Sequence, residues 1–505
     1  MGKQKSVVKN YGYNLIYQIF LIVTPFITTP YIARVLGAAG VGKYSFTFSI
    51  VSYFTLFAAL GFGYYAQREI ARAGEDKSKV SRIFWEIFIL RLFSVGFVLA
   101  VYIALAFFNV YGEYTELIWI FSVNIIVIAL DVSFVFQGRE EFGFIATVNI
   151  IVKVIGIASV FLFVKEASDV SVYALCNTAA LIISTLLLWI KIPKVLVKVN
   201  AKELEVYKHL KPALRLFIPT VAISVYTLLD RILVGLIVPG TIEKVLEDGT
   251  TVVMKISDIE NGFYEQAVKI TKMALTVVTA LGTIMIPRNS KEVASGNMEA
   301  FKFNIEKSTK FVFFIGIPIM FGLIAVSSNF APWFFGDGYE KVPSLIKIFS
   351  AIILIIGISN VLGLQYLIPL GEDKKFTIAI CCGALINFAL NMVLIYYFQS
   401  YGAAIASVIA ESVVTGIMLF YVRKDIKLSV ILKNMVKPLI GGVIMFVPVY
   451  ILATVVFTPS ILHTLISIAA GFVIYAVCMA VLRDDMMSFI FGKIKSILKS
   501  RKSGG

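Results

Sequence analysis

Two short stretches of this chain each end an apolar segment on an arginine and continue into a glycine-containing turn. In the first, Pro30 to Phe46, Arg34 is followed by the sequence GAAGVGKYSF. In the second, Asp230 and Arg231 end another apolar segment, and NGFYEQA stands after an insertion where GVGKYSF stands in the first. An arginine guanidinium binds phosphate through paired, charge-assisted hydrogen bonds. The repeated pattern therefore predicts two related lobes that each present a cation to an anionic ligand.

The composition indicates the elements that position these arginines. Hydrophobic residues make up 59% of the 505 positions and charged residues only 15%, and the mean hydropathy is +0.89, whereas soluble proteins are about 45 to 50% apolar. The apolar runs are about 20 residues long, which is the length of a helix that crosses a bilayer, and they lack the short alternation of a membrane β-barrel. The sequence predicts an all-α integral membrane protein.

The apolar runs predict about fourteen transmembrane helices. Lysines and arginines outside these runs fall mostly in alternate loops, which predicts that both termini lie on the cytoplasmic side of the cell membrane. The net charge of +15 is therefore assigned to topology and to contact with anionic lipid, and no nucleic-acid partner is expected. The predicted spans are 11–36, 44–65, 84–108, 117–136, 144–164, 170–190, 214–238, 264–286, 308–330, 342–364, 377–397, 403–422, 436–457 and 461–482.

These helices predict five segments in the chain. An N-lobe at 1–190 holds helices 1 to 6, a cytoplasmic segment at 191–213 links it to a C-lobe at 214–422, helices 13 and 14 occupy 423–482, and a basic tail covers 483–505. The linking segment and the tail are both expected to form helices on the membrane surface. In the tail the apolar residues share one helical face, although a solvated basic tail is an alternative. The insertion at 239–260 is expected to form a hairpin or cap that faces outward.

Neither the cysteines nor the histidines form a site that could hold a metal or cofactor. The four cysteines lie inside apolar runs without ligand spacing, so we expect small core residues, and His209 and His463 are isolated in the sequence. No cofactor, metal or catalytic residue is predicted. The basic N-terminus resembles a signal peptide, but its apolar stretch is long and interrupted by Pro25, Pro30 and Arg34, so an uncleaved first helix is expected.

Charged residues inside the apolar runs are the remaining candidates for function. A charge at the centre of a membrane helix costs about 2.5 to 3.5 kcal/mol, so each is either functional or paired. The candidate anion-binding cations, besides Arg34 and Arg231, are Arg91, Lys153, Lys269 and Lys272. Asp131, Asp230 and Glu411 could bind a coupling ion. The structural alternative for each cation is snorkelling toward the interface or an ion pair, for example between Arg91 and Asp131.

Five motifs in the sequence resemble those of a known family. PYIARVLGAAGVGKYSF, FQGREEFGFIATVNIIVK, ALGTIMIPRNS, FFGDGYEKVPSLIKIFS and GAAIASVIAES are similar to motifs of Wzx-type polysaccharide flippases, within the multidrug, oligosaccharidyl-lipid and polysaccharide exporter superfamily. The resemblance implies two pseudo-symmetric six-helix lobes, alternating access, and transport of undecaprenyl-pyrophosphate-linked oligosaccharide. Polysaccharide polymerase and glycosyltransferases would be partners. Helices 13 and 14 resemble the pair that borders a lipid-tail groove in flippases of the MurJ type.

Two other functions stay open. A drug or cation antiporter of the same superfamily usually needs an acidic pocket, whereas the first helix here carries an arginine and no carboxylate. A membrane polymerase or glycosyltransferase would need a large external loop or a clustered acidic site, and the loops here are short. A transporter rather than an enzyme is therefore expected. The sequence does not identify the sugars, so O-antigen, capsule, exopolysaccharide and teichoic-acid units are all compatible with it.

Overall fold

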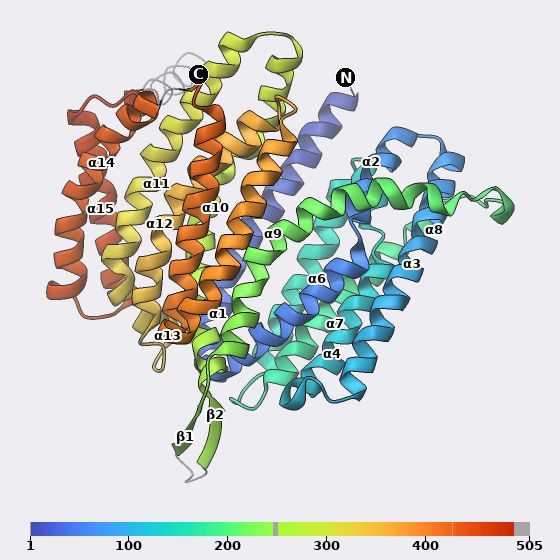
Figure 1. The fold of residues 1–505 in the computed structure, drawn as a ribbon, viewed down its shortest axis with the longest axis horizontal. Coiled ribbons are helices and arrows are strands. Elements are labelled where there is room, and N and C mark those ends of the chain that lie inside the picture. Colours follow the sequence, from blue (N-terminus) through green and yellow to red (C-terminus); the bar gives the residue numbers. More distant parts are fainter. Residues whose placement is uncertain (1, 246–250, 427, 489–505) are drawn as a thin grey trace, which may run out of the picture. The chain divides into compact units, whose positions relative to one another are not determined.

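The computed structural model describes residues 2–245, 251–426 and 428–488. It divides into two compact units, Met1–Gly262 and Phe263–Gly505, and Figure 1 shows both as helical. The predicted lobe boundary between residues 190 and 214 stays a prediction, because this division follows packing rather than the internal repeat.

The first unit contains nine helices and a hairpin among its described residues. The helices are α1 (Gly2–Ala59), α2 (Phe62–Ala73), α3 (Lys77–Phe107), α4 (Thr115–Leu130), α5 (Ser133–Gly138), α6 (Phe142–Phe163), α7 (Val170–Trp189), α8 (Ile192–Val195) and α9 (Leu210–Ile237). The antiparallel strands β1 (Thr241–Val245) and β2 (Thr251–Lys255) follow, with Thr241 opposite Lys255. The hairpin predicted for the insertion is confirmed.

The second unit begins within α10 (Ile256–Ala294), whose first seven residues belong to the first unit. It continues with α11 (Met298–Phe335), α12 (Val342–Asn360), the π-helical turn η4 (Val361–Leu367), α13 (Asp373–Val422), α14 (Leu428–Ile451), the π-helical turn η5 (Leu452–Val456) and α15 (Ile461–Val481). The helices α14 and α15 pack on α11 (Figure 1). There the side-chain amide of Asn329 on α11 donates to the carbonyls of Ala453 and Phe457 near the end of α14.

Two of the long helices each contain a bend that separates two predicted spans. In α1 the bend lies at Gly37, with φ of 65°, a conformation that glycine adopts without a Cβ clash. In α13 it lies at Gln399, with φ of 54°. The structure has eleven segments long and apolar enough to cross a membrane among the described residues. With the two bends and α9, they match the fourteen predicted spans. The fold prediction is confirmed, and the chain is a multi-pass membrane protein.

Three local predictions have different outcomes. The linking segment is not the predicted surface helix, because after α8 it becomes extended and then forms two 3₁₀ turns, Ala201–Glu203 and Val206–His209. Of the four cysteines, only Cys176 is buried and Cys381 is exposed, so the expected core role is wrong for Cys381. The predicted amphipathic tail lies mostly at 489–505, outside the described residues.

Apolar residues cover the outside of the helices as well as the core. The core of the first unit includes fully buried aromatic side chains such as Phe84, Phe121 and Phe136. On the outside, Phe107 is 81% exposed and Phe472 is 75% exposed, which a membrane helix tolerates because lipid tails are as apolar as the side chain. Hydropathy therefore does not distinguish the buried face of these helices from the face toward lipid.

Candidate functional site

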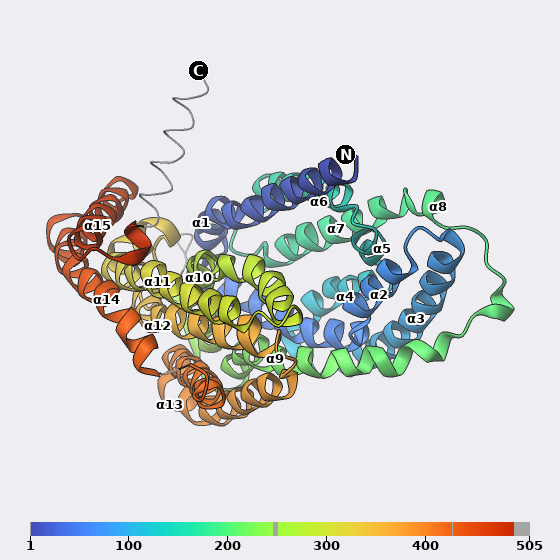
Figure 2. The same cartoon turned by 90° about the horizontal axis from the view of Figure 1, so that it is seen from above.

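A polar cavity of about 320 Å³ lies among α1, α6 and α7 within the first unit. These three helices pack against one another, and Figure 2 shows the first half of α1 alongside α6 and α7. The cavity is lined by Tyr17, Leu21, Thr24 and Thr28 of α1, by Asn149, Val152, Lys153, Gly156, Ile157 and Val160 of α6, and by Tyr173, Asn177, Ala180, Leu181 and Ser184 of α7. It is therefore a pocket between membrane-spanning helices.

The lining residues recur at helical spacing on all three helices. Lys153 follows Asn149 by four positions on α6, and Asn177 follows Tyr173 by four on α7, so each pair lies on one face of its helix. At the middle of the cavity wall, a Cβ on Gly156 would lie 3.1 Å from the Cβ of Ala180. Small residues at this crossing let α6 and α7 approach closely.

Hydrogen bonds hold the polar side chains of this cavity in place. The Ser184 hydroxyl donates to Asn149 Oδ1 at 2.6 Å, and Asn149 Nδ2 lies 3.5 Å from the Tyr17 hydroxyl, which links all three helices. Asn177 Nδ2 donates to the backbone carbonyl of Tyr173 at 2.9 Å. Asn149 and Ser184 are residues that sequence reasoning missed. The signal that could have found them is a set of polar residues at helical spacing within apolar runs.

Lys153 is the cation of this cavity. Its side chain is exposed to the cavity, and no hydrogen bond or ion pair of its ammonium group occurs within the described part of the chain. None of the lining residues named above is a carboxylate. An ammonium group with amides and hydroxyls around it can bind a phosphate and the hydroxyls of a sugar. Lys153 therefore has surroundings that suit an anion.

The two arginines of the repeated stretches have different environments in the first unit. Arg34 is exposed on α1, three residues before the bend. Arg231 is 8% exposed, and its guanidinium donates to the Thr227 carbonyl one turn earlier on α9. Both also interact with other groups. That they face one cavity from opposite sides stays a prediction.

The structure brings the two repeated sequences into direct contact. A Cβ on Gly42 of the first would lie 1.6 Å from the Asp258 carbonyl oxygen, just before the second, and a Cβ on Gly262 would lie 2.0 Å from the Ala38 carbonyl oxygen. Asn261 Nδ2 donates to the Arg231 carbonyl at 2.9 Å. The two stretches that are similar in sequence therefore lie against each other in the fold.

Arg91 and Asp131, which also belong to the first unit, are not among the residues that line the Lys153 cavity. Arg91 is buried, with one guanidinium nitrogen donating to the Asp131 carbonyl at 2.6 Å and another 3.7 Å from its carboxylate. Asp131 ends α4 and also accepts from the Ser133 amide. Arg91 and Asp131 thus form the ion pair that was the structural alternative to a role in binding. It joins α3 to the end of α4, so their use in anion or ion binding stays a prediction.

Four predicted residues remain, of which one lies in the first unit. Asp230 on α9 is 1% exposed. In the second unit, Lys269 is half-buried and Lys272 exposed on α10, and Glu411 is half-buried on α13. Each of these four residues interacts with a neighbour.

A buried polar cluster around Glu86 is the main feature that sequence reasoning missed. The Glu86 side chain is fully buried, and its carboxylate accepts from His209 Nε2 at 2.7 Å and from the Glu205 amide at 2.8 Å. Arg82 and Lys208 form ion pairs with it at 3.0 and 3.1 Å. His209, expected to be isolated, thus lies in a network. A lone glutamate within the apolar sequence FWEIF was the available signal.

The Glu86 cluster fixes the linking segment to the first unit. The Tyr65 hydroxyl on α2 bonds His209 Nδ1 at 2.7 Å, so His209 lies between Tyr65 and Glu86. Earlier on α3, the Ser81 hydroxyl accepts from the Val197 amide at 2.8 Å. Among the residues described, no group of three or more histidine, cysteine or acidic side chains is placed to hold a metal ion. The cluster is best explained as a fastening of the segment.

Two curated proteins are similar to this chain over most of its length. A curated protein of Escherichia coli strain K12 named "Putative O-antigen transporter" is 25% identical over 83% of this chain and 97% of its own length. A protein of that name from Shigella dysenteriae is 23% identical over 79% of this chain and 96% of its own.

Solved structures with the same fold include two transporters. The inward closed lipid II flippase MurJ covers 92% of this chain and 100% of its own, with a TM-score of 0.65 and 18% identity. An inward-facing multidrug resistance transporter of the MATE family covers 81% of this chain and 98% of its own, with a TM-score of 0.58 and 14% identity. The sequence model described as "Polysaccharide biosynthesis protein" matches residues 7–293. With more than half of its length matched, the chain belongs to the polysaccharide biosynthesis protein family.

Proposed function

We propose that this protein is a flippase for undecaprenyl-pyrophosphate-linked oligosaccharides, which it moves across the cell membrane by alternating access for the assembly of a surface polysaccharide. The observation that carries the proposal is the position of Lys153 in a polar cavity between membrane-spanning helices. Membership of the family supports it, as do relatives named for O-antigen transport and the fold shared with a lipid II flippase.

The chemistry of the cavity suits this substrate. A pyrophosphate that leaves water must exchange its hydration shell for fixed donors, and a cation supplies the strongest of these. The amides of Asn149 and Asn177 and the hydroxyl of Ser184 can donate to and accept from sugar hydroxyls. Arg34 and Arg231 would bind the same pyrophosphate at another step of the cycle.

Two rival functions are less well supported. The MATE fold is compatible with drug export, but a cationic drug would meet a lysine in this cavity, and none of its described lining residues carries negative charge. A membrane polymerase would lengthen the lipid-linked glycan. Incubating the purified protein with that glycan, and measuring its length and its leaflet, distinguishes an enzyme from a flippase.

Energy coupling and partners are part of the proposal. Asp131, Asp230 and Glu411 are the carboxylates that could bind the coupling ion, and amide variants of the responsible residue would lose ion-driven transport while still binding substrate. If all three variants transport normally, the membrane potential acting on the cationic cavity is the drive. Polysaccharide polymerase and glycosyltransferases would be functional partners, and anionic lipid would contact the basic segments.

The direct test uses three lysine variants in a transport assay. Lys153→Ala should lower the rate of movement of lipid-linked oligosaccharide in proteoliposomes by about tenfold or more, the worth of one charge-assisted hydrogen bond. Lys153→Arg keeps the charge and should retain part of the rate. Lys165→Ala at the end of α6 is the matched control, because that ammonium donates to the Phe161 carbonyl outside the cavity. Full transport by Lys153→Ala would overturn the role of this cavity.

A further inference from the structure

An open apolar groove of about 620 Å³ lies on the first unit, apart from the Lys153 cavity. Its lining comes from the end of α1, the start of α2, the middle of α3, the last 3₁₀ turn of the linking segment and the first residue of α9. Six aromatic residues contribute walls, namely Phe54, Phe57, Phe62, Phe93, Phe97 and Tyr207. The hydroxyl of half-buried Ser94 donates to the Ala58 carbonyl at 2.9 Å. Because the Ser94 proton is already used within the protein and the other lining groups are mainly apolar, the groove suits an apolar ligand.

The break between α1 and α2 shapes one wall of this groove. Leu60 and Gly61 both have positive φ, 42° and 75°, so the chain turns sharply between the two helices and Leu60 and Phe62 both line the groove. A Cβ on Gly61 would lie 2.7 Å from the Ala213 carbonyl oxygen of α9. The close approach at Gly61 holds α9 against the break, so the wall is a fixed part of the fold.

The groove has the length of one leaflet, and basic residues follow in the sequence where one of its ends reaches α9. Along α3 it runs from Leu90 to Val101, which at 1.5 Å per residue is about 16 Å, or about half of the hydrocarbon core. Tyr207 and Leu210 line it where the linking segment enters α9. Exposed Lys211 and Arg215 follow one turn apart on α9, and Lys208 adjoins them in sequence.

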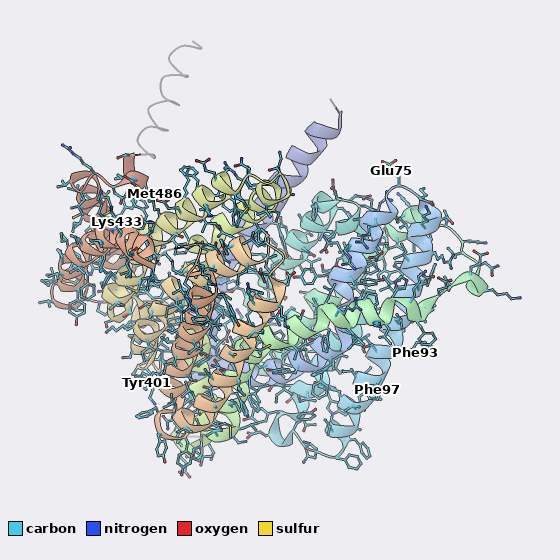
Figure 3. The ribbon with its side chains drawn as sticks, turned by 45° about the horizontal axis from the view of Figure 1, so that its top comes forward. Glu75, Phe93, Phe97, Tyr401, Lys433 and Met486 are labelled. Carbon is cyan, nitrogen blue, oxygen red and sulfur yellow. The ribbon has the colours of Figure 1, made fainter. Side chains whose placement is uncertain are left out.

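Three aromatic side chains of the groove are largely exposed. Phe93 and Phe97 are 72% and 73% exposed and project one turn apart from α3 (Figure 3). Tyr207, on the linking segment, is 82% exposed. Rigid rings around a wide groove are filled better by a branched, unsaturated chain than by a straight saturated one, because close packing requires matched volume.

We infer that this groove binds the polyprenyl chain of a phosphate-linked lipid, with the phosphate at the basic end formed by Lys211 and Arg215. The inference rests on the proposed function and assigns the lipid portion of its substrate. It places that chain on the first unit, whereas the sequence resemblance suggested the helix pair that is now α14 and α15. The Glu86 cluster contributes by holding Tyr207 and Leu210 at the groove through their neighbour His209.

The test measures binding of undecaprenyl phosphate to the purified full-length protein by native mass spectrometry. The double variant Phe93→Ala, Phe97→Ala should bind it at least about tenfold more weakly, and Phe107→Ala is the matched control because Phe107 lies on the same helix, is 81% exposed and does not line the groove. Lys211→Gln with Arg215→Gln should weaken binding of undecaprenyl phosphate but not of uncharged undecaprenol. Equal displacement by dioleoylphosphatidylglycerol would overturn the inference, as would unchanged binding by the double phenylalanine variant.

The same variants separate this inference from the proposed function. If the double phenylalanine variant binds undecaprenyl phosphate as tightly as the wild type does, and both move lipid-linked oligosaccharide at the same rate, the inference fails and the flippase proposal stands. If the wild type binds undecaprenyl phosphate in the groove but moves no lipid-linked oligosaccharide, the groove is supported and the flippase proposal fails.

Discussion

Gly42 on α1 and Gly262 on α10 each lie against the backbone of the other's helix. A Cβ on Gly42 would overlap the carbonyl of Asp258, and a Cβ on Gly262 would overlap the carbonyl of Ala38. Next to this crossing, the Tyr114 hydroxyl donates to Asp258 at 3.0 Å and Lys255 pairs with Glu113. Only glycine at both positions allows the two helices to meet here, so the crossing depends on the residues that make the two stretches similar.

Alanine at either glycine should destabilise the protein. Gly42→Ala or Gly262→Ala would force the helices apart, and overpacking of this kind costs about 1 to 3 kcal/mol or more. Thermal unfolding of the purified protein should show a lower Tm for both variants. Gly96→Ala on α3 is the control, since its Cβ would meet nothing within 4 Å, and it should unfold at or slightly above the wild-type temperature. A wild-type Tm for both crossing variants would contradict this reading.

Loss of the Glu86 carboxylate should release the linking segment. Glu86→Ala leaves His209 and Lys208 without their buried partner, and breaking such a pair costs about 3 to 5 kcal/mol. Trypsin should then cut faster at Lys198 and Lys202, which are in the exposed linker.

The matched control for Glu86 is an exposed carboxylate. Glu75→Gln, at the loop before α3 (Figure 3), removes an exposed acid and should leave the cleavage rate unchanged. Equal cleavage of wild type and Glu86→Ala would show that the cluster does not fasten the segment.

The ion pairs of Glu141 should make part of the stability depend on pH. Burial alone would raise the pKa of Glu141, but Lys191 and Arg139 bond its carboxylate and hold the pKa below its ordinary value of 4.5. A carboxylate with a lowered pKa stabilises the fold above its unfolded pKa, and this contribution is lost as the pH falls through the folded pKa.

The measurement for Glu141 is the Tm of wild type and Glu141→Gln between pH 7 and pH 3. The wild type should be more stable by up to about 1 kcal/mol at neutral pH, and the difference should shrink below about pH 4.5. In a Lys191→Gln background the difference should be smaller at every pH. A difference that grows as the pH falls would reverse the sign of this prediction.

Substitution of Arg34 and of Arg231 should have different effects on the stability of the fold. Arg34 is exposed, so Arg34→Ala should be expressed and unfold like wild type, whereas Arg231→Ala removes a buried side chain that donates to the Thr227 carbonyl and should lower the Tm. Lysine at either position keeps the charge but loses the paired donors, so transport should be impaired but not abolished. Full polysaccharide export by the double alanine variant would exclude both residues from substrate binding.

The hairpin and the linking segment should lie on opposite sides of the membrane. With the native cysteines replaced by serine, Val253→Cys on β2, a site 61% exposed, should react with a membrane-impermeant maleimide in intact cells. Glu203→Cys in the linking segment should react only after permeabilisation, because basic loops stay in the cytoplasm. Labelling of Glu203→Cys in intact cells would invert the predicted orientation.

The sequence alone determined the features that depend on local composition. The length of the apolar runs sets the number of spans, since each must cross the same hydrocarbon thickness. The acidic insertion between α9 and α10 became the hairpin expected of it. The repeated stretches around Gly42 and Gly262 were also visible in the sequence, although their contact was not.

Only the tertiary structure decided which charged side chain faces a cavity and which is paired. Lys153 and Arg91 are both lone cations in apolar runs, yet one lines a polar cavity and the other is buried against Asp131. Glu86 meets His209 across 123 positions of sequence. A membrane helix is apolar both on the face toward lipid and on the face toward protein. Its hydrophobic periodicity therefore does not predict which face packs against the other helices, that is, its rotation about its own axis. That rotation follows from packing between distant segments, which no local pattern contains.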